Sequence, residues 1–241
     1  MFHFFRRKKA EPVFDWPVDM HSHLVPGVDD GCRTVEESLS ILRYMREMGV
    51  KKWITTPHIF YEYYRNDPST IEAGYLELKK HLAEVNEDFE ITFAAEYYFD
   101  EHLVRMISEK PLLTFGNQYL LVETNMLSEP HGLNEFIFQA GLKGYTIILA
   151  HPERYSYMLG NFKRLEELKD RGVMLQVNML SYSGFYSIPS MKMVREMTDL
   201  GLIDFIGSDC HNLQQATMIR EASKDKYFRK TLALKLVNYS L

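Results

Sequence analysis

The 241-residue sequence has few cysteines and no long apolar run. Its two thiols, Cys32 and Cys210, are too few for a disulfide framework or a thiolate zinc site, so we expect any metal ion to be held by nitrogen and oxygen. A membrane span needs about 18 consecutive apolar residues, which the chain lacks. The N-terminus also lacks the apolar stretch and small-residue cleavage site of a secretory signal. These absences predict a cytoplasmic protein.

An excess of basic charge is also missing. Lysine and arginine total 28 against 33 aspartates and glutamates, which gives a formal net charge of −5. A general nucleic-acid-binding protein usually carries a strong basic excess, so we expect no nucleic-acid partner. With 46% hydrophobic residues, the composition excludes a disordered chain and suits one globular domain.

Residues 1–17 differ in composition from the rest of the chain. An aromatic cluster at residues 2–5 precedes four consecutive cations at residues 6–9. Such a segment can make weak contact with an anionic membrane surface, although a short solvated tail is the simpler interpretation. We therefore divide the chain into an N-terminal extension, residues 1–17, and a single domain, residues 18–241.

Within this domain, short apolar runs alternate with segments of helical periodicity. The runs predict strands at 18–23, 52–57, 91–96, 119–124, 146–151, 174–178 and 205–209. Capping residues and glycine stops predict helices at about 34–48, 67–82, 132–142, 162–171 and 189–200, with a final helix at 230–241.

Seven strand-then-helix units in sequence order imply parallel strands with helical crossovers. A closed α/β barrel of the (β/α)7 type, one unit short of eight, fits this regular alternation best. An open doubly wound sheet is the alternative. However, the glycine-containing turn after the first strand lacks the G-x-G-x-x-G spacing of a dinucleotide site.

Histidines and carboxylates gather at the ends of the predicted strands. Eight lie there and a ninth lies in the loop after the first strand: His21, His23, His58, Glu96, Glu123, His151, Asp209, His211 and Asp30. Each has an ordinary structural interpretation, such as a hydrogen bond within a strand or a helix cap. In a barrel, however, the C-terminal ends of all strands meet at one rim, so these nine side chains are predicted to converge.

Five histidines and four carboxylates without sulfur suit manganese, iron or zinc, and nine ligands exceed the capacity of one ion. Three divalent ions would bring a charge of +6 against −4 from the carboxylates. Such a site attracts a phosphate dianion and can activate water against it. The ligand set therefore predicts a metal-dependent phosphate hydrolase.

Seven motifs occur together in order along the chain: MHSHLVPGVDDG, TTPH, AAEYY, VET, AHPERY, QVN and SDCHN. Their combination closely resembles the PHP metallohydrolases, and within them the bacterial manganese-dependent protein tyrosine phosphatases of capsular and exopolysaccharide gene clusters. The resemblance covers about residues 18–213.

The resemblance implies a distorted (β/α)7 barrel of the PHP type with three divalent ions, manganese or alternatively iron or zinc. The first ion would be held by His21, His23, Glu96 and Asp209. Glu96 would bridge to a second ion bound by Glu123 and His151. The third would be held by Asp30, His58 and His211.

Arg154, in AHPERY, matches the arginine that faces the substrate phosphate in such enzymes, and a surface salt bridge is its alternative. Similar proteins often carry a second arginine shortly after SDxHN. Here that segment is Leu213–Ala216, and Arg220 is the nearest candidate. The resemblance therefore implies catalytic roles for Arg154, which also binds substrate, and for Glu96 as the bridging ligand.

The function implied is hydrolysis of phosphotyrosine on a bacterial membrane tyrosine kinase or its partners, which would regulate polysaccharide synthesis and export. Three alternatives remain. These are a small-molecule phosphatase such as histidinol phosphatase, a PHP-type nuclease, and a non-catalytic protein whose interactions depend on metal.

Overall fold

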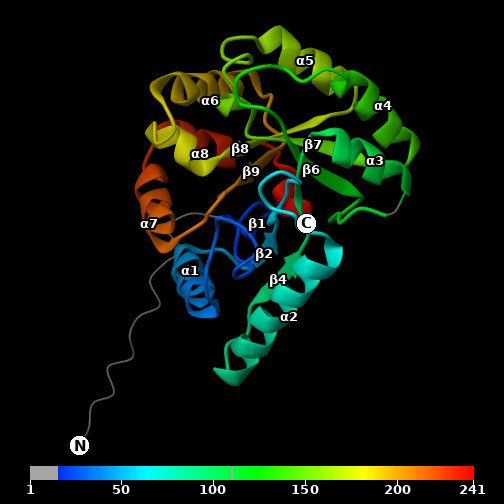
Figure 1. The fold of residues 1–241 in the computed structure, drawn as a ribbon. Coiled ribbons are helices and arrows are strands. Elements are labelled where there is room, and N and C mark those ends of the chain that lie inside the picture. The colour runs from blue at the N-terminus through cyan, green and yellow to red at the C-terminus, as the bar shows by residue number, and fades with distance from the viewer. Residues whose placement is uncertain (1–15, 110) are drawn as a thin grey trace, which may run out of the picture.

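The computed structural model describes residues 16–109 and 111–241 (Figure 1). The basic-aromatic segment of the predicted extension lies outside the described residues. The last two residues of that extension pack on the barrel. Trp16 is buried, and the carbonyl of Pro17 accepts hydrogen bonds from the backbone N–H groups of Lys51 and Lys52.

The strands form a ring at the centre of the molecule with the helices outside it (Figure 1). They are β1 Val18–Asp19, β2 Lys52–Thr55, β3 His58–Ile59, β4 Glu90–Phe93, β5 Glu96–Tyr98, β6 Tyr119–Glu123, β7 Thr146–Ala150, β8 Met174–Asn178 and β9 Phe205–Gly207. Every strand pairing is parallel, in the orders β1-β2-β4 and β3-β5-β6-β7-β8-β9.

Two predicted strands are each broken into two pieces. The run 52–57 divides into β2 and β3 at Pro57, which has no N–H to offer a ladder, and the run 91–96 divides into β4 and β5 at Ala94-Ala95. Pairing continues across the breaks, because Ala94 N–H donates to Thr55 O and Glu96 N–H donates to Pro57 O. The predicted units are therefore present, but two of them bend.

Backbone hydrogen bonds join the two sheets into a closed barrel. The segment after β1 accepts from and donates to the segment after β9, through Asp209 N to His21 O at 2.8 Å and His23 N to Cys210 O at 3.0 Å. On its other side, Ser22 O accepts from Thr56 N at 2.7 Å. This closure confirms the distorted (β/α)7 barrel.

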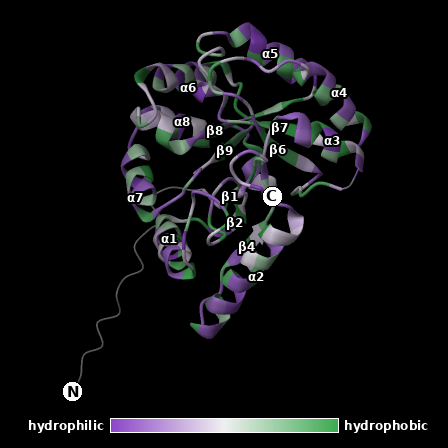
Figure 2. Ribbon diagram, in the orientation of Figure 1, coloured by the Kyte–Doolittle hydropathy of each residue, from purple (hydrophilic) through white to green (hydrophobic). Residues whose placement is uncertain are grey.

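The helices are α1 Val35–Met48, α2 Pro68–Glu84, α3 Glu101–Glu109, α4 Leu133–Leu142, α5 Phe162–Asp170, α6 Ile188–Leu200, α7 Leu213–Ala222 and α8 Lys226–Leu232. The side chains of Thr34 and Asp67 cap α1 and α2 as their sequence patterns predict, and Gly49 and Gly201 end α1 and α6. Each helix presents hydrophilic and hydrophobic stretches (Figure 2). Among the described residues, no helix is both long enough and apolar enough to cross a membrane.

The predicted final helix at 230–241 is wrong. Helix α8 ends at Leu232, and only a short 3₁₀ turn, Val237–Ser240, follows. The reason is Asn238, whose buried amide donates to Val18 O and Ile206 O and accepts from Ile206 N. This side chain ties the chain end to β1 and β9, which a continuous helix would prevent.

Alternation along the strands divides the core in two. On β6, Leu120 and Val122 face the helices, whereas Tyr119 and Leu121 belong to the apolar cluster inside the barrel. Glu123 follows on the inward face, because alternate residues of a strand share a face. Apolar side chains thus fill the barrel below, and polar ones occupy its C-terminal mouth.

Candidate metal centre

The nine side chains singled out in the sequence meet at this mouth. Seven of them line a cavity of about 460 Å³: Asp30, His58, Glu96, Glu123, His151, Asp209 and His211. His21 and His23 are completely buried. Three groups of ligand atoms are close enough together to hold an ion.

The first group is His21, His23, Glu96 and Asp209, the set assigned to the first ion. The Nε2 atom of His21 lies 3.1 Å from Glu96 Oε2 and 3.4 Å from Asp209 Oδ1. The Nε2 atom of His23 lies 3.5 Å and 3.3 Å from the same two oxygens. All four side chains are buried, so two nitrogens and two oxygens face one point away from solvent.

The second group is His58, Glu96 and Glu123, with His58 Nδ1 3.3 Å from an oxygen of each glutamate. His151, the histidine predicted to bind this ion, is not part of the group, although its Nε2 lies 3.0 Å from Glu96 Oε1 and 4.0 Å from Glu123 Oε2. Glu96 therefore has imidazoles near both of its oxygens, as a bridging carboxylate would.

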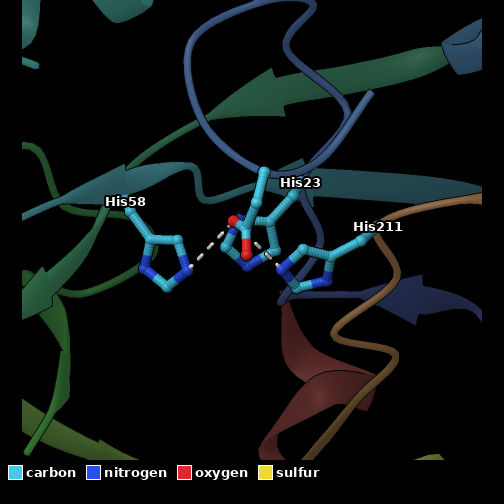
Figure 3. Close-up of side chains that lie close together, drawn as sticks. His23, His58 and His211 are labelled. Atoms are coloured by element: carbon cyan, nitrogen blue, oxygen red, sulfur yellow. Dashed lines mark ion pairs between the residues drawn. The ribbon is translucent and has the colours of Figure 1, made fainter. Parts of the chain in front are cut away.

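The third group contains one residue more than the sequence suggests. Asp30 Oδ1 lies 3.7 Å from His58 Nε2 and 3.5 Å from His211 Nε2, and Figure 3 shows these two rings turned toward a carboxylate between them. His23 joins this group, and its ring stacks on that of His211 with centroids 4.0 Å apart. His23 thus lies between the first and third groups.

Three polar side chains that the sequence analysis missed orient the histidines. Asp29 Oδ2 accepts from His23 Nδ1 at 2.7 Å, and Gln176 Oε1 accepts from His21 Nδ1 at 2.9 Å. Asn178 in turn accepts from the amide of Gln176. Because the Nδ1 atoms of His21 and His23 are held by these hydrogen bonds, their Nε2 atoms face the groups of metal-ligand atoms. The VDDG and QVN motifs contain these residues, but spacing alone does not show which aspartate is buried.

The backbone at this rim is strained. His151 and Asp209 have φ values of 34° and 50°, in the left-handed region that side chains other than glycine rarely adopt. At Gly207, a Cβ would lie 2.6 Å from the Cβ of His21, so only glycine fits there. Such features persist where the surrounding structure fixes them, often at functional sites.

Charge and unpaired atoms indicate that divalent ions fit the centre. Burial alone would raise the pKa of Glu96, but the charges of His21 and His58 outweigh it and hold that pKa well below its usual range. The Nδ1 atom of His58 is buried without a hydrogen-bond partner among the described residues, although two carboxylates lie beside it. Ionised oxygens around ring nitrogens that lack a partner are the donor set of a metal site once the imidazoles give up their protons to the incoming ion.

Arg154 stands at the edge of the cavity, in the 3₁₀ turn Pro152–Arg154. Its Nη1 donates to Asp209 Oδ2 at 3.0 Å, and its guanidinium lies 4.4 Å from the ring centroid of Tyr186. Arg154 thus pairs with Asp209, a predicted metal ligand inside the site. It does not form the surface salt bridge that was its alternative interpretation.

Arg220 is exposed on α7 and does not line the cavity. Helix α7 begins directly after the SDCHN motif. Asn212 caps this helix by accepting from Gln215 N–H, and Gln215 Oε1 accepts from His211 N–H. Both side chains line the cavity. The side chains at the start of α7 that face the cavity are therefore amides, and among the described residues that line it Arg154 is the only arginine.

Comparison with known proteins gives consistent matches. A family model described as "Capsular polysaccharide synthesis, CpsB/CapC" matches residues 17–233. The tyrosine-protein phosphatase CpsB of Streptococcus pneumoniae is 28% identical over 219 residues, covering 88% of this chain and 90% of CpsB. The tyrosine-protein phosphatase YwqE of Bacillus subtilis is 25% identical over 198 residues, covering 82% and 78%.

A solved structure from work on YwqE and CpsB of these organisms, described as "unique metal-dependent tyrosine phosphatases", is also similar. It has a TM-score of 0.78 at 24% identity and covers 90% of both chains. This likeness shows the shared fold.

Proposed function

We propose that this chain, which belongs to the CpsB/CapC family of capsular polysaccharide synthesis, is a metal-dependent enzyme that hydrolyses phosphotyrosine on proteins. The observation that carries the proposal is the convergence of nine nitrogen and oxygen side chains with Arg154 at one cavity. A phosphate monoester dianion is the ligand that such a combination of cation sites and guanidinium favours.

Three divalent ions, with manganese our first choice, would be held by the ligand sets assigned above. Glu96 would bridge two of them, and His23 would stand between the first and third. Bound there, the ions supply Lewis-acid activation of water and stabilise charge developing on the phosphoryl oxygens.

The chain's own groups hold the substrate for this reaction. The Arg154 guanidinium presents N–H donors at the cavity edge and can bind two phosphate oxygens at once. Asp29 and Gln176 hold His23 and His21 at fixed ring angles, so little reorganisation is needed when phosphate enters. The oxygen of water bonds to phosphorus while the bond between phosphorus and the phenolic oxygen breaks. One proton of the water ends on the phenolic oxygen, so the products are inorganic phosphate and tyrosine.

The proposed substrate is a phosphotyrosine protein, and more narrowly the tyrosine-rich tail of a bacterial membrane tyrosine kinase. We place the enzyme in the cytoplasm and assign it a role in regulating capsular or exopolysaccharide synthesis and export.

Turnover of three substrates by the manganese-loaded protein tests this function. We expect release of phosphate from a phosphotyrosine peptide, with much lower kcat/KM for histidinol phosphate and no cleavage of single-stranded DNA. A preference for histidinol phosphate would favour the small-molecule alternative, and no turnover by metal-replete protein would favour a non-catalytic role.

A further inference from the structure

An aromatic turn lies over one side of the cavity, between β3 and α2. The turn runs from Phe60 to Tyr64 and is closed by three backbone hydrogen bonds: Phe60 N to Tyr64 O at 3.0 Å, Tyr64 N to Phe60 O at 2.7 Å and Tyr63 N to Phe60 O at 3.1 Å. Asn66 ties it to the rim, since its amide donates to Val28 O and His58 O. The turn is therefore fixed in place before any ligand arrives.

Most rings around the cavity already pack against a partner. Phe60 stacks on Tyr98 with centroids 3.8 Å apart, and Tyr64 stacks on His58 at 5.3 Å. The Arg154 guanidinium packs on the face of the Tyr186 ring, which also lines the cavity.

Tyr63 is different. It lines the cavity and touches the edge of the aromatic wall, with its ring centroid 4.9 Å from that of Phe60, yet 72% of it remains exposed. A large exposed aromatic side chain beside a polar cavity buries more of its surface only when a ligand enters the cavity.

We propose that Tyr63, backed by Phe60, forms an aryl subsite that makes the enzyme select aromatic over aliphatic phosphate esters. The inference rests on the proposed phosphatase function and deepens it. A phosphate held by Arg154 and the metal centre must direct its ester group out through the cavity mouth, beside this turn. An aryl group can pack there against Tyr63, whereas an alkyl group of a small metabolite offers little surface for it.

Two inhibitors that differ only in the ring test the subsite by binding to the metal-loaded protein. Phenylphosphonate and methylphosphonate carry the same charged head, and neither is hydrolysed. For Tyr63→Ala we expect the Kd of phenylphosphonate to rise about three- to tenfold, the range of one aromatic pair, with methylphosphonate unchanged. Tyr63→Phe should restore binding, because the ring and not the hydroxyl makes the contact.

Tyr61→Ala is the matched control. Tyr61 belongs to the same turn and is 48% exposed, but it packs on His102 with centroids 4.9 Å apart and does not line the cavity. Both Kd values should stay as in wild type. The aryl subsite is overturned if Tyr63→Ala weakens the two phosphonates equally, or weakens neither.

Kinetics on a phosphotyrosine peptide separate this proposal from the proposed function. Tyr63→Ala should raise KM by a similar factor and leave kcat near wild type. A wild-type protein that binds phenylphosphonate through Tyr63 but turns over no phosphotyrosine peptide would refute the phosphatase function and leave the aryl subsite standing. Normal wild-type turnover with an unchanged KM in Tyr63→Ala would support the phosphatase function and refute the aryl subsite.

Discussion

Arg154 and Asp209 are joined across the mouth of the barrel, with Nη1 of the guanidinium 3.0 Å from Oδ2 of the carboxylate. The other oxygen of Asp209 faces His21 and His23, so this carboxylate connects the ligand cluster to the Arg154 guanidinium. Burial alone would lower the pKa of Arg154, but the charge of Asp209 outweighs it and raises that pKa, so the guanidinium stays charged.

Arg154→Ala should lose roughly 2–4 kcal/mol of transition-state stabilisation, the typical effect of removing one donor to a developing oxyanion. Arg154→Lys should also be impaired, because an ammonium cannot form the bidentate pair. Metal content should not change, since Asn178 and Tyr186 still donate to Asp209 Oδ2. The measurements are kcat/KM on a phosphotyrosine peptide and elemental analysis.

Arg220→Ala is the control for this prediction. Arg220 is exposed on α7 away from the cavity, so its removal should leave kcat/KM close to wild type. Near-normal activity of Arg154→Ala with full metal occupancy would remove Arg154 from the phosphate site.

Glu96→Gln should lose both metal and activity. The purified, metal-replete wild type should hold two to three ions per chain, and Glu96 is the carboxylate positioned to serve two of them. The control is Glu90→Gln, a change on the exposed end of β4. Elemental analysis showing at most one ion in the wild type, or full occupancy in Glu96→Gln, would contradict the multinuclear centre.

The barrel and its rim could be predicted because apolar runs of strand length alternate with helical segments and eight of the nine candidate ligands lie at the ends of predicted strands. The sequence could not show that His23 also joins the third group or that His58 reaches Glu123, because spacing along the chain does not give the distances between side chains of different strands. The final helix failed for a similar reason. The local pattern at 230–241 is helical, but the contacts of Asn238 with β1 and β9 outweigh it.

Neither cysteine should be needed for catalysis. Arginine does not follow either one at the sixth position, so the thiolate loop of cysteine-dependent tyrosine phosphatases is missing. Cys32 and Cys210 are completely buried in the apolar core, and burial raises the pKa of the Cys32 thiol to about 11. At pH 8, about one Cys32 side chain in a thousand is then the reactive thiolate.

Cys32→Ser and Cys210→Ser should therefore keep most of the activity, and iodoacetamide at pH 8 should not inactivate the native enzyme. Chelation should abolish activity and added manganese should restore it. Inactivation by the alkylating reagent with metal still bound would instead indicate a cysteine mechanism.

Metal binding should release protons near neutral pH. Burial alone would lower the pKa of His21, but the charges of Glu96 and Asp209 outweigh it and raise that pKa from 6.5 to about 9. The metal-free protein thus carries a proton on His21 that an ion must displace, so manganese affinity should rise with pH until about 9. Calorimetric titration in buffers of different ionisation enthalpy measures the protons released.

The same shift contributes to the pH dependence of the stability of the metal-free fold, together with the raised pKa of His23 beside it. Because the folded pKa of His21 lies above the unfolded value, its stabilising contribution is complete below about pH 6.5 and is lost as pH rises through 9. Metal-free protein should therefore melt at lower temperature at pH 9 than at pH 6.5. His21→Gln should reduce this difference, and an unchanged pH profile in that variant would contradict the assignment.

Gly207→Ala should damage the metal centre through packing alone. An added Cβ would lie 2.6 Å from the Cβ of His21 and 3.0 Å from the Gln176 amide, so His21 must move from its place beside Glu96. Overpacking of this kind typically costs 1–3 kcal/mol of stability. Gly141→Ala provides the matched control, because nothing lies within 4 Å of its added Cβ and Gly141 lies inside α4, where alanine should stabilise by up to about 1 kcal/mol. Thermal unfolding should show a lower melting temperature for Gly207→Ala and a higher one for Gly141→Ala. Elemental analysis should show metal lost only from Gly207→Ala. Full metal content in Gly207→Ala would show that His21 is not held in place by the close approach of β9.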